Sequence, residues 1–171
     1  DGVGVMAMWR VLGGLGFDLK WDLGWVHDTV DHYMVLPPEE RPRAHGKLVF
    51  RMHYAFNENY LLPLSHDEVK PAMQSLLAKM PGDDWQRFAN LRALLAYQAS
   101  HPGKKLLFMG TEFGQWAEWD EKRALDWHLL EWSGPGGAHA PLHRGLRRCL
   151  ADLNHLYTTD PALHALDSHP R

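Results

Sequence analysis

Three ionisable residues follow directly on a short apolar segment of the chain. His66, Asp67 and Glu68 come after residues 60–65, an apolar run short enough to be a buried strand. Burying three such groups unpaired is costly, so they must be paired, solvated in a cleft or bound to a ligand. Spacing alone leaves two interpretations open. Either the cluster binds or reacts with a ligand, or Asp67 caps the following segment and His66 is a satisfied core residue.

A second polar cluster follows another apolar segment, residues 106–110. It contains Thr111, Glu112 and Gln115, with a glycine on either side of Thr111–Phe113. These glycines would let the backbone turn tightly beside a ligand, and Glu112 could orient a neighbouring cation or hydroxyl. The alternative is a strand-end turn with a structural carboxylate. We expect Glu112 and Gln115 to support a site rather than to carry its chemistry.

Metal and cofactor chemistry finds no support in the sequence. His139 and His143 have helical spacing, but Pro141 lies between them and no His-Glu-x-x-His is present. The single cysteine, Cys149, cannot build a structural zinc site. The chain also lacks a phosphate-cradling glycine-rich loop before a helix and a G-x-S-x-G elbow. We expect no metal and no cofactor.

Composition excludes several classes of protein. The 171 residues are 45% hydrophobic and 23% charged, which is typical of a globular protein. A formal net charge of −3 offers no field to hold nucleic acid or an anionic membrane, so neither is expected as a partner. The sequence contains no apolar run of the ~20 residues that span a bilayer. One cysteine fits a reducing compartment, and we expect a cytoplasmic protein.

Aromatic residues are unusually frequent for a chain whose mean hydropathy is −0.39. The flat faces of Trp and Tyr suit the apolar faces of sugar rings as well as they suit a core. We expect most of these rings to pack in the core or in loops, and one or two to contact a substrate. The tryptophans near expected strand ends and loops are Trp21, Trp25, Trp116, Trp119, Trp127 and Trp132.

The elements that must position these side chains alternate between strand and helix. Strands are predicted at 17–21, 60–65 and 106–110; helices at 25–33, from 84 onward and over 142–156; and a helix or irregular lid at 47–57. Such alternation predicts a parallel α/β fold, in which chemistry gathers at the carboxyl ends of the strands. A complete (β/α)₈ barrel needs about 250 residues. The sequence therefore predicts part of a barrel.

The clearest of these helices begins after Gly82. Asp83 and Gln86 have the spacing of a capping box, which satisfies the free N–H groups at a helix start. The apolar residues that follow at helical spacing are Trp85, Phe88, Leu91 and Leu95.

Six stretches carry a family resemblance in their order and spacing: 13–17 (GGLGF), 20–29 (KWDLGWVHDT), 62–69 (LPLSHDEV), 80–83 (MPGD), 102–110 (PGKKLLFMG) and 125–128 (LDWH). Together they resemble the bacterial 1,4-α-glucan (glycogen) branching enzymes of the α-amylase superfamily. The resemblance implies that the chain holds the last three β/α units of the catalytic barrel. Strand six would lie near 17–21, strand seven would end at His66 and Asp67, and strand eight near Glu112.

The same resemblance implies roles for the polar residues. His66 matches the substrate-binding histidine of the family, and Asp67 matches the aspartate that stabilises the transition state. Trp21 and Glu68 are expected to contact the substrate, an α-1,4-glucan or glycogen. A retaining glycosyl transfer passes through an oxocarbenium-like state, and hydrogen bonds to the sugar hydroxyls can strengthen as that charge develops.

The nucleophile and the acid/base of the family lie on strands four and five, which precede the segment matched here. We therefore expect neither the nucleophile nor the acid/base in this chain, and no branching activity from the chain alone. Residues 1–12 differ from the family and are interpreted as an atypical lead-in, truncated or frameshifted. Residues 13–167 are assigned to the C-terminal part of the glycosidase-type catalytic barrel, and 168–171 to a tail.

Lys70, Pro71 and Ala72 stand where the family usually has Val-His-Gly, which puts an acceptor-glucan contact in question.

Two alternatives to a branching-enzyme fragment with a monomeric parent remain. One is a non-catalytic glucan-binding or complementing fragment, because exposed strand edges favour association. The other is a related trehalohydrolase or amylase-type hydrolase. The stretches 20–25 and 62–65 favour branching.

Overall fold

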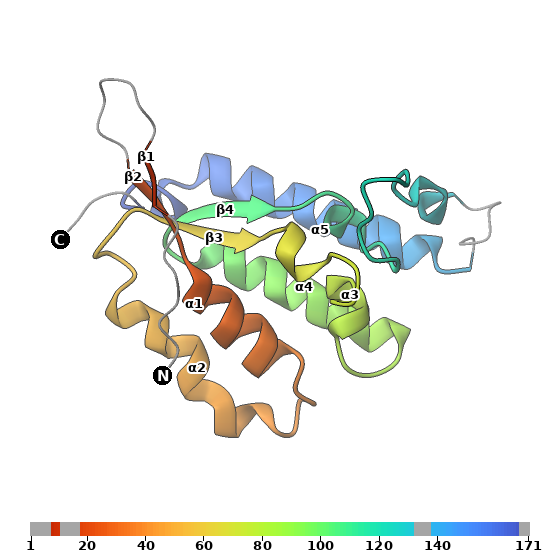
Figure 1. The fold of residues 1–171 in the computed structure, drawn as a ribbon, viewed down its shortest axis with the longest axis horizontal. Coiled ribbons are helices and arrows are strands. Elements are labelled where there is room, and N and C mark those ends of the chain that lie inside the picture. The colour runs from red at the N-terminus through yellow and green to blue at the C-terminus, as the bar shows by residue number, and fades with distance from the viewer. Residues whose placement is uncertain (1–7, 11–17, 132–137, 168–171) are drawn as a thin grey trace.

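A four-stranded sheet forms the centre of the fold (Figure 1). The computed structural model describes residues 8–10, 18–131 and 138–167. The strands are β1 (Met8–Arg10), β2 (Asp18–Trp21), β3 (Tyr60–Leu64) and β4 (Lys104–Leu107), in that spatial order. The neighbouring strands β2, β3 and β4 run parallel, whereas β1 pairs antiparallel with β2. The predicted parallel α/β arrangement is confirmed for these strands.

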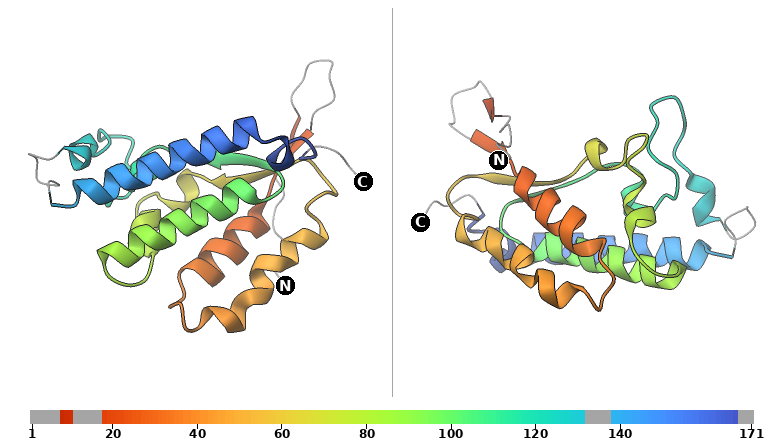
Figure 2. Two further views of the ribbon diagram at one scale, coloured as in Figure 1. Left: turned by 180° about the vertical axis from the view of Figure 1, so that it is seen from behind. Right: turned by 60° about the horizontal axis from the view of Figure 1, so that its bottom comes forward.

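Helices connect the parallel strands or follow the last of them, and they lie on one side of the sheet. They are α1 (Leu23–Trp25), which continues as a π-helix (Val26–Met34), α2 (His45–Phe50), α3 (Leu76–Lys79), α4 (Asp84–Ser100) and α5 (Ala140–Thr159). In the right-hand view of Figure 2, α4 and α5 lie on the same side of the sheet as α1. The short 3₁₀ turns are Arg41–Ala44, Arg51–His53, His66–Glu68, Thr111–Phe113, Trp127–Leu130 and Pro161–Leu163.

The hydrophobic core lies between the strands and this helical layer. Leu62 and Leu64 of β3 are fully buried against Phe88 and Leu91 of α4 and Leu146 of α5. Burial of apolar side chains of this size stabilises the fold by about 1.5–3 kcal/mol each. The core therefore joins β3, which ends at the polar cluster, rigidly to the two longest helices.

A buried glutamine reinforces the join between α4 and the sheet. The Gln98 side chain donates hydrogen bonds to the Leu62 carbonyl (2.9 Å) and to the Leu106 carbonyl (3.1 Å). Backbone carbonyls of neighbouring strands thus share one donor from the helix. These two hydrogen bonds fix the position of α4 relative to β3 and β4.

Several predicted elements differ in detail from the observed ones. The predicted capping box of α4 is confirmed, but Trp85 is 64% exposed and therefore does not belong to the buried face of that helix. β4 begins at Lys104, earlier than predicted, and residues 108–110 form a turn instead of continuing the strand. The segment 47–57 contains the end of α2 and a 3₁₀ turn.

Other predictions fall outside the described residues. These are the lead-in apart from β1, the glycine-rich turn at 13–16, Phe17, Trp132 and the tail at 168–171. The antiparallel β1 was not predicted, because its short sequence carries no clear strand pattern.

Candidate functional site

The polar cluster after β3 is a single 3₁₀ turn, closed by a capping box. Ser65 Oγ accepts a hydrogen bond from the Asp67 N–H (3.2 Å), and the Glu68 carboxylate accepts one from the Ser65 N–H. Glu68 is only 7% exposed as a result. Two backbone donors are satisfied reciprocally, which fixes the turn. The capping residues are thus Ser65 and Glu68, and the interpretation of Asp67 as a cap is wrong.

His66 and Asp67 are the residues that this turn presents to solvent. Their side chains are 52% and 53% exposed, so His66 is not a core histidine. His66 Nε2 lies 3.5 Å from Asp67 Oδ1, and Lys70 Nζ lies 3.0 Å from the same oxygen. The pair therefore stands at the carboxyl end of β3 with one cation beside it. An exposed carboxylate and imidazole can both hydrogen-bond a polyhydroxylated ligand.

Aromatic rings flank His66. Its ring centroid lies 5.9 Å from that of Phe108 and 6.4 Å from that of Trp119, and those two rings meet edge to face at 5.1 Å. Phe108 follows β4, and its N–H donates to the Leu64 carbonyl (2.9 Å). The carboxyl ends of β3 and β4 thus share a half-buried aromatic floor beside the imidazole.

The second polar cluster is a tight turn after β4. Gly110 and Gly114 both have positive φ, at 90° and 70°. A Cβ at Gly114 would lie 2.8 Å from Leu146, so a side chain there would also collide with α5. The glycine pattern therefore fits a strand-end turn. Glu112 is half-buried, and no hydrogen bond or ion pair of its carboxylate occurs among the described residues.

Gln115 organises the loop that follows this turn. Its side chain donates to the Ala117 carbonyl (3.1 Å) and accepts from the Asp126 N–H (2.9 Å). The same loop reaches the first cluster, because the Trp119 N–H donates to the Val69 carbonyl (2.8 Å). The two clusters that the sequence placed on separate strands are therefore joined through one loop.

Glu118 is a residue that sequence reasoning missed. Its carboxylate accepts hydrogen bonds from the Ala72 N–H (3.1 Å) and the Gln74 N–H (2.7 Å). Ala72 and Gln74 have φ values of 71° and 63°, which are unfavourable for residues other than glycine. Glu118 thus holds the segment after His66 in a strained conformation. No local sequence pattern pointed to Glu118, because its contacts join residues that are 46 and 44 positions apart.

Trp21 lies at a different level of the sheet from His66. It pairs in register with Leu61, at the beginning of β3. His66 comes after the end of that strand, on the order of 15 Å further along at about 3.3 Å per residue. The structure therefore brings His66 and Asp67 together with Phe108 and Trp119, but it does not bring Trp21 to them.

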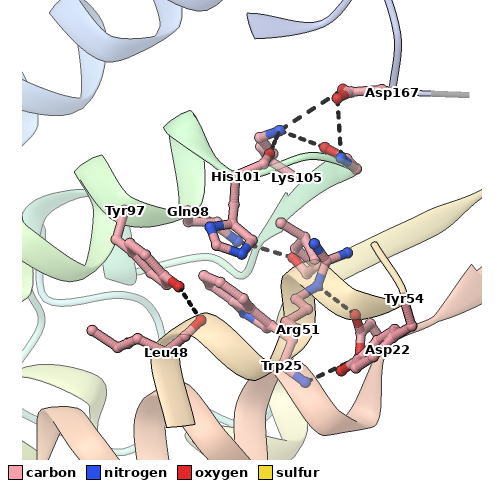
Figure 3. Close-up of polar contacts among 12 residues, drawn as sticks. Asp22, Trp25, Leu48, Arg51, Tyr54, Tyr97, Gln98, His101, Lys105 and Asp167 are labelled. Atoms are coloured by element: carbon pink, nitrogen blue, oxygen red, sulfur yellow. Dashed lines mark hydrogen bonds and ion pairs between the residues drawn. The ribbon is translucent and has the colours of Figure 1, made fainter. Parts of the chain in front are cut away.

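A buried polar network begins at Asp22, directly after β2 (Figure 3). Asp22 accepts from the Trp25 N–H (3.0 Å) and pairs with Arg51 Nε at 2.6 Å, and both charged side chains are under 5% exposed. The Trp25 ring stacks on Tyr97, with centroids 5.5 Å apart. His101 contacts both rings, and its burial, with Arg51 and Lys105 nearby, lowers its pKa to about 4. This network joins α1, the 3₁₀ turn after α2, and α4 with its C-terminal cap.

The end of the described chain is tied to the same region. Asp167 accepts from the Gly103 N–H (3.0 Å) and from the Tyr157 hydroxyl (2.8 Å). Lys105 lies 3.8 Å from Asp167, and burial lowers its pKa to about 8 against the pull of that carboxylate. These contacts seat the segment after α5 against the beginning of β4.

No group of three or more His, Cys, Asp or Glu side chains that could hold a metal occurs in the described part of the chain. His143 is fully buried, and its Nδ1 lies 2.8 Å from the Phe113 carbonyl. Burial also lowers its pKa. His139 lies 3.4 Å from Asp84.

Within 8–10, 18–131 and 138–167, no helix is both long and apolar enough to cross a bilayer.

The fold and this geometry define a class of protein. Parallel strands whose carboxyl ends carry an exposed carboxylate, an imidazole and aromatic rings are typical of α/β proteins that place a ligand site at that edge. The neutral aromatic floor and the hydrogen-bonding groups suit an uncharged, hydroxyl-rich ligand.

Comparison with curated proteins gives the particular relatives. The chain is 55% identical over 158 residues to the 1,4-alpha-glucan branching enzyme GlgB of Rhodopseudomonas palustris, 57% identical over 157 residues to that of Ralstonia nicotianae, and 56% identical over 155 residues to that of Nitratidesulfovibrio vulgaris. These matches cover 91–92% of this chain. The chain is therefore homologous to a segment of the bacterial branching enzymes, and the resemblance seen in the sequence is confirmed.

The matched segment is a small part of each relative. The chain spans about a fifth of the length of the curated relatives, from 19% to 23%. No protein-family model matches the chain.

Proposed function

We propose that the chain forms the C-terminal part of the catalytic barrel of a 1,4-α-glucan branching enzyme. Consecutive parallel strands with their helices on one side are the repeating unit of a (β/α)₈ barrel. β2, β3 and β4 would be the last three strands of that barrel. Residues 13–167 would form this part, with 1–12 as a lead-in and 168–171 as a tail.

The outward-facing pair His66 and Asp67 carries the proposal. In a retaining transfer, the α-1,4 bond breaks, the glucan is held covalently on the enzyme, and a 6-hydroxyl of an acceptor glucan takes it. Positive charge develops on the sugar ring in each transition state. Asp67 would stabilise that charge, and His66 would hydrogen-bond a sugar hydroxyl, so both contacts strengthen as the bond breaks.

Lys70 gives Asp67 a second partner in the absence of glucan. The Lys70 Nζ lies 3.0 Å from Asp67 Oδ1, and His66 Nε2 lies 3.5 Å from the same oxygen. A sugar hydroxyl that binds Asp67 must share or displace this contact. Both side chains are about half exposed, so the exchange costs little.

The remaining predicted residues take supporting places in the proposal. Gln115 and Glu112 would hold the loop that carries Trp119 beside the site. Trp21 and Glu68 stay predicted substrate contacts. The Glu68 carboxylate is already bonded to the Ser65 N–H, so its first effect is to orient the turn.

The catalytic nucleophile and the acid/base would come from other strands of the barrel. Retaining enzymes hold these two carboxyl groups about 5–5.5 Å apart. Neither Glu68 nor Glu112 is assigned to those roles, because each matches a family position with a different role. The substrate would be an α-1,4-glucan or glycogen in the cytoplasm, the parent protein a monomer, and no cofactor is needed.

A chimera tests this function. The matching segment of the Ralstonia nicotianae enzyme is replaced by this chain, and branching is followed by the loss of blue colour in iodine-stained amylose. We expect the chimera to branch amylose, and Asp67→Asn to lower its rate by about 100-fold or more, the scale of losing one stabilising group. Asp31→Asn, an exposed carboxylate on the π-helix, is the matched control and should keep the rate. A folded chimera with equal rates for both variants would contradict the role of Asp67.

A second candidate function rests on the free edge of the sheet. β4 pairs with β3 on one side and with no described strand on the other. Such an edge can pair with another chain. The chain would then be a non-catalytic piece that complements or binds a partner carrying the other strands. Sedimentation distinguishes this candidate: it requires association with a fragment containing the upstream barrel strands, and a chain that stays monomeric in that mixture would exclude it.

A further inference from the structure

Three arginines of α5 line a groove between that helix and the 3₁₀ turn Trp127–Leu130. Arg144, Arg147 and Arg148 stand at positions i, i+3 and i+4, so they share one face of the helix. Leu130 and Ala151 complete the lining, and the groove has a volume of about 450 Å³. Sites for small molecules have volumes of roughly 300–1,000 Å³. We call this feature the arginine groove.

Two of the three arginines in the groove, Arg147 and Arg148, have no carboxylate partner in the described part of the chain. Arg147 and Arg148 are exposed and form no ion pair with any residue of the described chain. Glu131 and Asp152, which are close in sequence, form no ion pair with either arginine. The whole chain has a formal charge of −3, so this concentration of positive charge is local. A chain of negative net charge has no general attraction to anions, so anion binding would be specific to this groove.

The groove also has a defined wall. Arg144 Nε donates to the Leu130 carbonyl at 2.6 Å, which fixes the arginine against the 3₁₀ turn. Leu130 and Ala151 add apolar surface beside the guanidinium groups. Guanidinium groups bind phosphate oxygens through paired, charge-assisted N–H bonds. Apolar surface next to them suits a small carbon skeleton.

We infer that the arginine groove binds a phosphoryl group, as inorganic phosphate or as the phosphate monoester of a sugar. The site shares none of the residues placed around His66 and Asp67. It goes beyond the proposed branching function and would stand if that function were wrong. Two arginines that point to one oxyanion would neutralise it with several N–H donors.

Isothermal titration of the 171-residue chain at low ionic strength tests the inference. The probes are inorganic phosphate, glucose 1-phosphate and, as the uncharged comparison, glucose. Arg147→Gln/Arg148→Gln removes the two exposed charges, and Arg148→Gln alone is the milder variant. Arg43→Gln/Arg92→Gln is the matched control, because it removes the same charge from positions outside the groove. Far-UV circular dichroism checks that each variant is folded.

We expect both phosphorylated probes to bind and glucose not to bind. The groove double variant should lose at least tenfold in affinity, the single variant should lose part of it, and the control should lose less than twofold. Tighter binding of glucose 1-phosphate than of phosphate would identify a sugar phosphate as the ligand, and equal binding would identify free phosphate. Absence of binding to the unaltered chain, or an equal loss in the groove and control variants, would overturn the inference.

Discussion

The placement of His66 and Asp67 depends on the capping contacts of two neighbouring side chains. Ser65 and Glu68 satisfy each other's backbone N–H groups, and the turn between them leaves the imidazole and the carboxylate half exposed. A different cap would rotate the turn and change what faces the solvent. At this scale, the sequence His-Asp-Glu divides into two outward-facing residues and one inward-facing residue.

Ala72 is a position where one substitution should stabilise the protein. Its φ of 71° is unfavourable for alanine, whereas glycine adopts this conformation readily. The left-handed conformation costs about 1–2 kcal/mol, part of which the greater freedom of unfolded glycine offsets. Ala72→Gly should therefore raise the free energy of unfolding in urea by about 0.5–1 kcal/mol.

The matched control is Ala93→Gly, an exposed position inside α4. Glycine in a helix interior costs about 1 kcal/mol, so this variant should lose stability. If both glycine variants were destabilised alike, the strain assigned to residue 72 would be wrong.

His101 should make the stability of the protein depend on pH. Its pKa of about 4 in the folded protein lies below the ordinary value near 6.5, because burial disfavours the charged ring. The unfolded chain therefore takes up a proton at higher pH than the folded protein does, and stability falls as the pH drops from about 6.5 to about 4. Urea midpoints measured across this range should show that loss.

His101→Phe keeps a ring beside Trp25 and Tyr97 but cannot be protonated. Its urea midpoint should fall less steeply over the same pH range than that of the unaltered protein. His155→Phe, at an exposed position on α5, should leave the slope unchanged. Identical slopes for all three proteins would show that His101 is not the titrating group.

At the scale of elements, the ion pair between Asp22 and Arg51 connects β2 to the turn after α2. Both side chains are under 5% exposed, and the Arg51 NH1 and NH2 groups have no hydrogen-bond partner among the described residues. Rings of Tyr54 and Tyr60 pack against the guanidinium at 6.0 Å and 5.5 Å. Asp22 is thus the main compensation for a buried cation.

Removing both partners of this pair should cost less than the sum of the two single removals. Asp22→Asn leaves the cation buried and should lower the free energy of unfolding by about 3 kcal/mol. Arg51→Met leaves the carboxylate buried and should cost a similar amount. The double variant Asp22→Asn/Arg51→Met should cost clearly less than the sum, as a double-mutant cycle in urea would show. The exposed pair Lys20 and Glu58 is the control and should show little coupling. Additive losses at Asp22 and Arg51 would contradict the account.

Elements with a strong local pattern could be predicted from the sequence. The capping box of α4, the apolar run of β3 and the leucine spacing of α5 each depend on residues close in the chain. The turn that exposes His66 and Asp67 was also located correctly as the end of a strand. These features follow from local chemistry and periodicity.

The contacts between distant segments could not be predicted in the same way. Arg51 meets Asp22, and Glu118 meets Ala72, across separations that no periodicity encodes. Trp119 approaches His66 only because a long loop folds back over Val69. The aromatic surroundings of the site are therefore a property of the tertiary fold, although the tryptophans were recognised as candidates.

At the scale of the whole molecule, the proposal divides the chemistry of a barrel between segments. The chain would supply the transition-state stabiliser at the end of β3, while other strands would supply the nucleophile and the acid/base. The homologous segment is about a fifth of each branching enzyme, which agrees with such a division. A stabilising carboxylate without a nucleophile cannot form the covalent glucan intermediate.

The most direct measurement is the iodine-stained amylose assay on the purified 171-residue chain, run beside the chimera. The proposal predicts that the chimera removes the blue colour progressively, while the chain alone leaves it unchanged at any concentration. A progressive loss of colour with the chain alone, absent in its Asp67→Ala variant, would show that the chain carries complete chemistry and would contradict the proposal.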